Sequence, residues 1–408
     1  MNDAELFGKK YSWPVITDQM LNAVQLQMRE SISIYDGSGI IKELEQKMGR
    51  YYGKRHALLT SSGTAALQSA YYSLLLSDSD EIISCSYGFF ATISPLLHFH
   101  GKVILVDCDK YGNIDVHQIK KNISQNTKAI VITDMWGCPV DNYNEIVSLC
   151  RKNNIVLIED ASHCHGGKIN NEPVGFGSDI LIMSLQGNKI VTGGEGGILL
   201  TNDDDLFYKA VFYGHYNKRC KKQIPIDHYL SKFSKTGAGL KLRIHPVAAR
   251  MASVMFDDMT RIVDERSEFA EILNEKLSGN PLIKLINPPS DAKHSWYAYT
   301  FVYQGDMLTG VSTADFVEKM RLNGIADADQ PGSTGALTRC PIFQETIWKR
   351  RLHLNEDFFI VSYENAEFLS DHLIKLPCWQ KEWLCMADFY AKVINKITQE
   401  ILENTKLD

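Results

Sequence analysis

The chain has 408 residues, 44% of them hydrophobic, and a formal net charge of -6. Its length predicts two domains, and its composition is ample for a large core. The acidic balance excludes the basic field that binding to nucleic acid or an anionic membrane requires. Because no apolar run approaches the ~18 residues of a spanning helix and no signal-peptide pattern opens the chain, a cytoplasmic protein is expected.

Nine cysteines are scattered singly along the chain, without a CxxC pair. Their odd number and their spacing argue against a disulfide framework and against a structural zinc site. Cys164 lies between His163 and His165, which leaves open a metal cluster or a thiol nucleophile. No further ligand set has a recognisable spacing, so no metal site is predicted.

The chain opens with two helical patterns, over residues 16–30 and 39–52, separated by the loop YDGSG. After Gly53, short apolar runs alternate with helical stretches. These runs cover residues 56–60, 81–85, 103–106, 129–133, 155–159, 180–185 and 197–201. Because they are rich in Ile, Val and Leu on both faces, they predict a mostly parallel seven-stranded sheet with helices on each side. Ligands of such sheets bind beyond the carboxyl ends of the strands.

Two of these strand ends carry features that suit a flat, phosphorylated ligand. The first is followed by SSGTAALQSA, where Gly63 and Thr64 open a helix that offers free N–H groups and its positive dipole end to an anion. An ordinary helix cap explains the same residues. The second is followed by Tyr87, Phe89 and Phe90; one of these aromatics could stack on a heterocycle, and at least one is expected in the core.

The fifth run ends in Glu159 and Asp160, at the carboxyl end of an otherwise apolar strand. A buried carboxylate is costly unless a positive charge faces it, and a protonated pyridine nitrogen would supply that charge. A cap for the following segment is the alternative.

Lys189 lies between the apolar run 180–185 and a cluster of glycines at 193, 194, 196 and 197, where the backbone can turn sharply. Most lysines are solvated surface groups. Lys189 is a candidate Schiff-base former because of the other residues that the sequence offers for the same cofactor. A phosphate cup at Gly63 and Thr64, an aromatic at Phe89, an acid at Asp160 and this lysine are the parts that pyridoxal phosphate requires. The GxGxxG fingerprint of a nicotinamide site is missing.

The runs SSGTAAL, SYGFFAT, VDCDKYGNID, IEDASHCHGG, SLQGNKIVTGGEGGILLTN and GLKLRIHPVAA resemble, in order and spacing, the DegT/StrS family of sugar aminotransferases over residues 12–395. The resemblance implies the fold type I architecture of pyridoxal-phosphate enzymes. An N-terminal segment and a large cofactor-binding domain would span residues 1–258, and a smaller α+β domain residues 259–408. A helix over 264–277 and strands including 297–303 are expected in that second domain.

The resemblance also assigns cofactor contacts. Lys189 matches the Schiff-base lysine and Asp160 the partner of the ring nitrogen. The other implied contacts are Gly63, Thr64 and Ser184 for the phosphate, Phe89 stacked on the ring, and His163 near the ring oxygen. Where the family has a GxNxR pattern whose asparagine reaches the neighbouring subunit's phosphate, Lys241 stands here, so a homodimer with active sites at the subunit interface is implied.

The implied reaction moves an amino group from glutamate or glutamine to the keto group of a nucleotide-linked, phosphorylated or free sugar or of a cyclitol, by a ping-pong mechanism. Dehydratases of the family carry histidine in place of the lysine, so Lys189 favours transamination. A dehydratase or lyase and a non-catalytic regulator remain as alternatives. His215, Tyr216 and Arg219 in one segment and Arg339 in another are candidate substrate contacts, or else residues of solvated loops.

Overall fold

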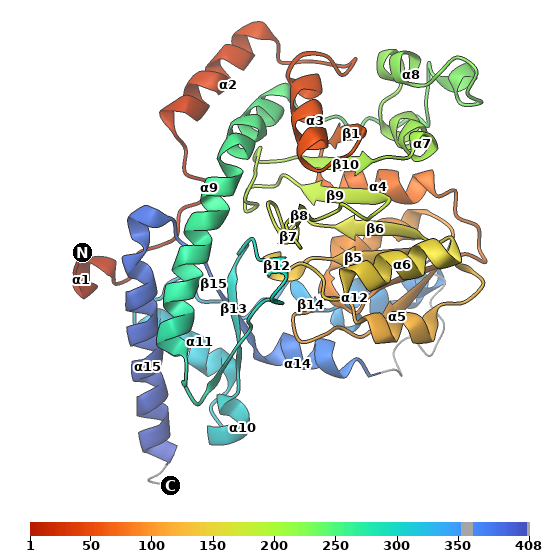
Figure 1. Cartoon of the computed structure of the whole chain (residues 1–408). Helices are drawn as coiled ribbons and strands as arrows, with labels where there is room; N and C mark the ends of the chain where they lie inside the picture. The colour runs from red at the N-terminus through yellow and green to blue at the C-terminus, as the bar shows by residue number, and fades with distance from the viewer. Residues whose placement is uncertain (352–361, 406–408) are drawn as a thin grey trace.

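The computed structural model describes residues 1–351 and 362–405. Its centre is a seven-stranded sheet in the order β1-β10-β9-β6-β5-β2-β4 (Figure 1). Each of the seven predicted apolar runs is one of its strands. Their bounds are β1 (His56–Thr60), β2 (Glu81–Cys85), β4 (Lys102–Val106), β5 (Thr127–Thr133), β6 (Val156–Asp160), β9 (Ile180–Ser184) and β10 (Gly197–Thr201).

The sheet is parallel except at β10, which is antiparallel to both of its neighbours, β1 and β9. The carboxyl ends of β1, β5, β6 and β9 therefore meet at one edge. In the register of the pairs, Thr133 lies beside Asp160 and Asp160 beside Ile182. This edge collects the segments that follow the strands, and it is where a ligand is expected.

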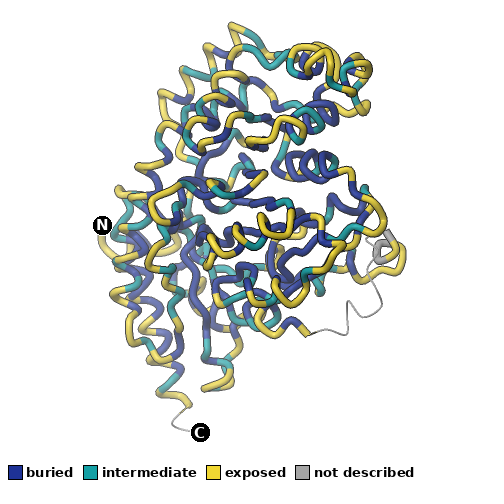
Figure 2. Tube along the Cα trace, turned by 45° about the vertical axis from the view of Figure 1, so that its right-hand side comes forward, coloured by how far each residue is buried: buried dark blue, intermediate teal, exposed yellow. Residues whose placement is uncertain are grey.

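Helices cover both faces of the sheet, so its strands lie among buried residues (Figure 2). Leu58, Ile182 and Leu199 point to the core that includes α4 and α7, whereas their neighbours Leu59 and Leu200 point to the core beneath α3 and α9. The helix bounds in the first 277 residues are α1 (Asp3–Leu6), α2 (Asp18–Glu30), α3 (Gly39–Tyr51), α4 (Gly63–Ser73), α5 (Val116–Asn122), α6 (Tyr143–Asn153), α7 (Asp204–Gly214), α8 (Lys218–Gln223) and α9 (Pro246–Leu277).

A smaller antiparallel sheet in the order β11-β13-β15 forms a second core with the last helices. The remaining helices are α10 (Gly305–Thr309), α11 (Thr313–Leu322), α12 (Pro341–Gln344), α13 (Thr346–Arg351), α14 (Glu364–His372) and α15 (Cys385–Thr405). The remaining strands are β3 (Tyr87–Phe89), β7 (Lys168–Ile169), β8 (Glu172–Pro173), β11 (Ile283–Leu285), β12 (Ala292–Lys293), β13 (Tyr299–Tyr303), β14 (Thr334–Ala336) and β15 (Leu373–Leu376).

Helix α9 crosses the predicted domain boundary between residues 258 and 259. The helix expected to begin at Asp264 begins at Pro246, so that start was wrong; His245 accepts a hydrogen bond from Val247 N as its N-cap, and proline stands in the first turn. The first half of α9 packs on the core that lies beneath α3 against the large sheet. The second half, from Phe269 to Leu277, packs on the second core. One continuous helix thus joins the two cores.

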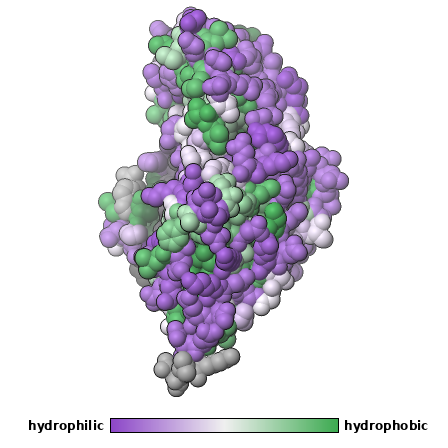
Figure 3. Space-filling view, turned by 90° about the vertical axis from the view of Figure 1, so that its left-hand side faces the viewer, coloured by the Kyte–Doolittle hydropathy of each residue, from purple (hydrophilic) through white to green (hydrophobic). Residues whose placement is uncertain are grey.

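The N-terminal segment contacts the two cores that α9 joins. Leu6 is buried in the second core, and Met20 on α2 is buried in the core beneath α3 and α9. Figure 3 views the side that carries α1, α2 and α15, where apolar patches lie among polar side chains. Leu21, Leu26 and Met28 on α2 are among the exposed apolar residues.

Candidate active site

A cavity of about 460 Å³ lies at the carboxyl edge of the large sheet. It brings together seven of the predicted cofactor contacts, which come from four different segments. Its lining includes Gly63, Thr64, Phe89, Asp160, His163, Ser184 and Lys189. The eighth predicted contact, Lys241, is exposed and does not line this cavity.

Lys189 reaches the cavity from the turn that follows β9. Its backbone N–H donates to Gln186 O at 2.9 Å, and Gly193 N–H donates to Leu185 O at 3.0 Å, so the chain doubles back beside the lysine. The loss of hydration inside the cavity lowers the pKa of the Lys189 amine to about 8, against an opposing effect of the Asp160 charge. An amine with this pKa has a larger neutral, nucleophilic fraction near physiological pH than an ordinary lysine.

Asp160 ends β6 and is buried. It accepts hydrogen bonds from Ser162 N at 3.1 Å and from Thr92 Oγ1 at 3.2 Å. Burial raises the pKa of this carboxyl, and the hydrogen bonds and the Lys189 charge oppose the rise. A carboxylate in this position is stabilised by a cation that faces it, so a protonated ring nitrogen suits the site.

The amino end of α4 lines one side of the cavity. Ser62 caps the helix by accepting a hydrogen bond from Ala65 N at 3.0 Å, and within the described chain the amides of Gly63 and Thr64 have no partner. A Cβ at Gly63 would lie 2.8 Å from Ser184 Cβ, so only glycine lets β9 approach this helix end so closely. Free amides at a helix N-terminus fit a phosphate, and the hydroxyl groups of Thr64 and Ser184 line the cavity beside them.

Aromatic rings line the space between these groups. The His163 ring stacks on Tyr297 with centroids 4.0 Å apart and planes inclined by 6°. Burial holds the pKa of His163 well below its usual range, so the imidazole is neutral. Phe89 is 38% exposed at the end of β3, whereas Tyr87 is buried, which confirms that one aromatic of this group belongs to the core.

The sequence analysis missed several residues at the site, among them Tyr297, Trp13 and Trp136. Tyr297 lies beneath Lys189, whose Nζ is 4.7 Å from the centre of its ring. Trp13 donates from Nε1 to Lys189 O at 2.9 Å and thereby ties the N-terminal segment to the lysine. Trp136 follows the carboxyl end of β5, and attention to every strand end would have found it. No motif in the sequence around Trp13 or Tyr297 connects either residue with the lysine.

The candidate substrate contacts lie outside this cavity. Arg219 is buried and donates to Glu45 Oε1 at 2.7 Å. His215 is buried nearby, Tyr216 is partly exposed, and Arg339 pairs with Asp371 at 2.6 Å. The stretch around Arg339 does reach the cavity, but through Ser333 and Thr334.

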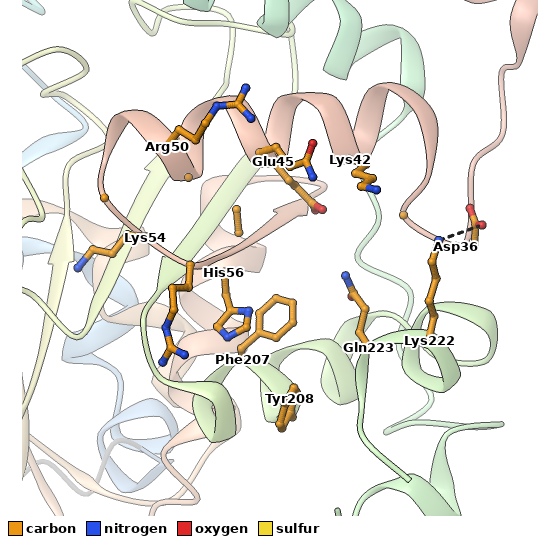
Figure 4. Close-up of a pocket in the computed structure, with 16 residues that line it drawn as sticks. Asp36, Lys42, Glu45, Arg50, Lys54, His56, Phe207, Tyr208, Lys222 and Gln223 are labelled. Carbon is orange, nitrogen blue, oxygen red and sulfur yellow. Dashed lines mark ion pairs between the residues drawn. The ribbon is translucent and has the colours of Figure 1, made fainter.

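The cavity of about 720 Å³ between α3, β1, α7 and α8 is a different place (Figure 4). Figure 4 shows His56 and Phe207 side by side, with Lys42 and Gln223 also directed toward the space, and the two rings stack at 4.3 Å. None of the predicted cofactor contacts lines it. Although this cavity is larger than the one at Lys189, it therefore lacks the residues that could bind the cofactor.

The cysteines and histidines near the site have no metal-binding arrangement. All nine cysteines are free thiols, and Cys164 is buried with its thiol donating to Gly137 O at 3.3 Å. Among the described residues, no group of three or more His, Cys, Asp and Glu side chains could hold a metal ion. None of the helices in that same part of the chain has the length and apolar character needed to cross a membrane.

Comparison with known proteins gives one family. The model of the DegT/DnrJ/EryC1/StrS aminotransferase family matches residues 15–385. The chain is 26% identical to the UDP-4-amino-4,6-dideoxy-N-acetyl-beta-L-altrosamine transaminase of Helicobacter pylori, over 90% of this chain and 92% of that protein.

Solved structures share the fold. An aminotransferase from Psychrobacter cryohalolentis superimposes with a TM-score of 0.83 at 21% identity, covering 96% of this chain and all of that one. The GDP-4-keto-6-deoxy-D-mannose-3-dehydratase of E. coli with bound hydrated PLP gives 0.80 at 21% identity, covering 95% of this chain and all of that one.

Proposed function

The chain belongs to the DegT/DnrJ/EryC1/StrS aminotransferase family, and from this premise we propose that it transfers an amino group from an amino acid to a keto-sugar. The observation that carries the proposal is the arrangement of Lys189 and Asp160 across one cavity from the open end of α4. Pyridoxal phosphate is the cofactor that uses all three groups together.

The residues of the cavity fit that cofactor. Asp160 would hold the ring nitrogen, and the amides of Gly63 and Thr64 with the Ser184 hydroxyl would hold the phosphate. Phe89 and His163 are the candidates for the ring faces. When bound, pyridoxal phosphate supplies an aldehyde for an amine to attack and a ring that withdraws electrons from the carbon being deprotonated.

Lys189 would have two tasks. Because its pKa is lowered, its amine would hold the cofactor and would also serve as the base that takes the proton from the substrate carbon. Trp13 and Tyr297 orient Lys189. Trp13 holds the backbone carbonyl of Lys189, and the ring of Tyr297 lies beneath the Lys189 amine. Asp160 is buried, and two hydrogen bonds fix the direction of its carboxylate. That carboxylate would therefore face the ring nitrogen of a bound cofactor without having to reorient during the reaction.

We assign glutamate or glutamine as the donor and a nucleotide-linked, phosphorylated or free keto-sugar or cyclitol as the acceptor. The support is family membership together with a relative named as a transaminase of a UDP-linked amino sugar. Nine free thiols also suit a cytoplasmic enzyme, which is the location we propose.

The reaction can be tested by colour. Protein loaded with pyridoxal phosphate should absorb visible light, and glutamate or glutamine should bleach it to the pyridoxamine form without any sugar present. A keto-sugar accepted by the enzyme should then restore the colour. Retained colour with every amino donor would contradict an aminotransferase and favour a dehydratase or a regulator on the same scaffold.

We further propose that the protein works as a homodimer in which Lys241 reaches the cofactor phosphate of the partner subunit. Two observations support this. Lys241 is exposed and does not line the cavity of its own subunit, and the adjacent apolar residue Leu240 is 39% exposed. Exposed apolar surface of this kind is typical of an interaction face.

Hybrid dimers test this arrangement. A Lys189→Ala subunit paired with a Lys241→Glu subunit would contain one intact site if Lys241 acts across the interface. The mixed dimer should then recover activity that both parent dimers lack. An inactive hybrid, with the mixed dimer verified by mass, would contradict the arrangement.

A further inference from the structure

The Lys189 cavity opens toward a second chamber of about 460 Å³. The two spaces share three lining residues, Asn188, Tyr297 and Lys375. Asn188 and Tyr297 flank the lysine, whereas Lys375 comes from β15 in the smaller sheet. Lys375 therefore stands at the junction of the two spaces and reaches it from the smaller sheet.

The position of Lys375 is fixed by its neighbour Asp329. Their backbones exchange two hydrogen bonds, of 2.8 and 3.1 Å, and their side chains form an ion pair at 3.1 Å. Nζ also lies 6.0 Å from the centre of the Trp136 ring, toward the Lys189 cavity. An ammonium group has three donors, so the single ion pair leaves it able to bind a second anion.

Few of the side chains that line the Lys189 cavity can carry a positive charge. Among the described residues that line the cavity, three side chains can be cationic: His163, Lys189 and Lys375. Burial keeps His163 neutral by lowering its pKa, and Lys189 is engaged with the cofactor in the proposed reaction. Among the described residues that line this cavity, Lys375 is thus the cation left for a substrate.

The chemistry of an amino donor requires such a cation. In an α-amino acid the carboxylate is attached to the carbon that loses the proton, so it must lie close to Lys189 when that carbon reacts. Lys375 is near enough for its charge to act on Lys189, adding to the effect of burial in lowering the pKa of that amine.

We propose that Lys375 forms a carboxylate-binding subsite that holds the α-carboxylate of the amino-acid donor beside Lys189. This inference rests on the proposed aminotransferase function. Asp329 positions the ammonium group, and the adjoining chamber gives the donor side chain room beyond the reacting carbon. Lys375 acts on binding and orientation, while the proton transfer belongs to Lys189.

The test follows bleaching of the loaded enzyme in single turnovers with L-glutamate. Lys375→Met keeps the aliphatic stem and should lower the ratio of rate to half-saturation concentration roughly 10- to 100-fold, as expected for losing a charge-assisted hydrogen bond. Return of colour with 2-oxoglutarate should fall equally, because that acid carries the same carboxylate. Lys375→Arg should restore most of both rates.

A matched donor and a control variant isolate the carboxylate. 4-Aminobutanoate is glutamate without its α-carboxylate, so its slow bleaching should be the same in the Lys375→Met enzyme and the unaltered one. Lys42→Met, in the other cavity, should leave both donors unaffected. The amount of bound cofactor before donor addition should be unchanged in all variants.

Two results would overturn the subsite. One is bleaching of Lys375→Met by glutamate at the unaltered rate and concentration dependence. The other is an equal loss with glutamate and with 4-aminobutanoate, which would make Lys375 a structural residue. Failure of the unaltered enzyme to bleach with any amino donor would instead contradict the proposed function.

Discussion

Replacing Lys189 by methionine should stabilise the cofactor-free protein while abolishing its activity. The pKa of this amine falls from 10.5 to about 8 on folding, chiefly through burial. At 1.36 kcal/mol per pKa unit, the charged lysine destabilises the folded state by about 3.4 kcal/mol at most. Methionine has a similar length and no charge, so the variant should escape this cost.

The pH dependence follows from the direction of this change. Between pH 8 and 10.5 the unfolded chain binds more protons at Lys189 than the folded one, so the free energy of unfolding rises with pH in that window. Lys189→Met lacks this contribution. Its advantage over the unaltered protein should be about 3 kcal/mol at pH 7 and shrink to about 1.4 kcal/mol at pH 9.5.

Urea unfolding of both cofactor-free proteins at the two pH values measures the difference. The urea midpoints should differ most at pH 7 and approach each other at pH 9.5. A variant no more stable than the unaltered protein at pH 7, or an advantage independent of pH, would refute the view that Lys189 is held at an energetic cost.

Two other residues give separate predictions. Asp160→Asn removes the charge that faces the ring nitrogen, and the turnover number should fall roughly 10²- to 10³-fold while the cofactor still binds through its phosphate; near-normal turnover would contradict the assignment. Arg219→Met leaves Glu45 buried without its partner and should lower the free energy of unfolding by about 3–5 kcal/mol, measured in urea, with part of the loss recovered in the double variant Arg219→Met/Glu45→Leu. A loss of activity without a loss of stability would instead support Arg219 as a substrate contact.

The sequence predicted the parts of the fold that depend on local pattern. Runs of Ile, Val and Leu bounded by polar turns identified all seven strands of the large sheet. Lys189, Asp160 and Gly63 could be connected because parallel strands deliver their carboxyl ends to one edge. Helix α9 begins at Pro246, 18 residues before the predicted start at Asp264, and proline in a first turn is a start signal that the prediction did not use.

The parts that were missed depend on contacts between distant segments. Trp13, Tyr297 and Lys375 come from the N-terminal segment, the stretch before β13 and the smaller sheet. Nothing in their local sequence distinguishes them from core or surface residues. For Arg219, the pairing with Glu45, 174 positions away, explains a buried charge that the sequence offered as a substrate contact.

The central claim is that Lys189 is the lysine that holds pyridoxal phosphate. Borohydride reduction of the loaded enzyme, followed by proteolysis and mass spectrometry, tests it directly. The account predicts the added cofactor mass on the peptide that contains Lys189, and its absence from Lys189→Met treated in the same way. A cofactor mass on another lysine, or equal labelling of the Lys189→Met variant, would contradict it.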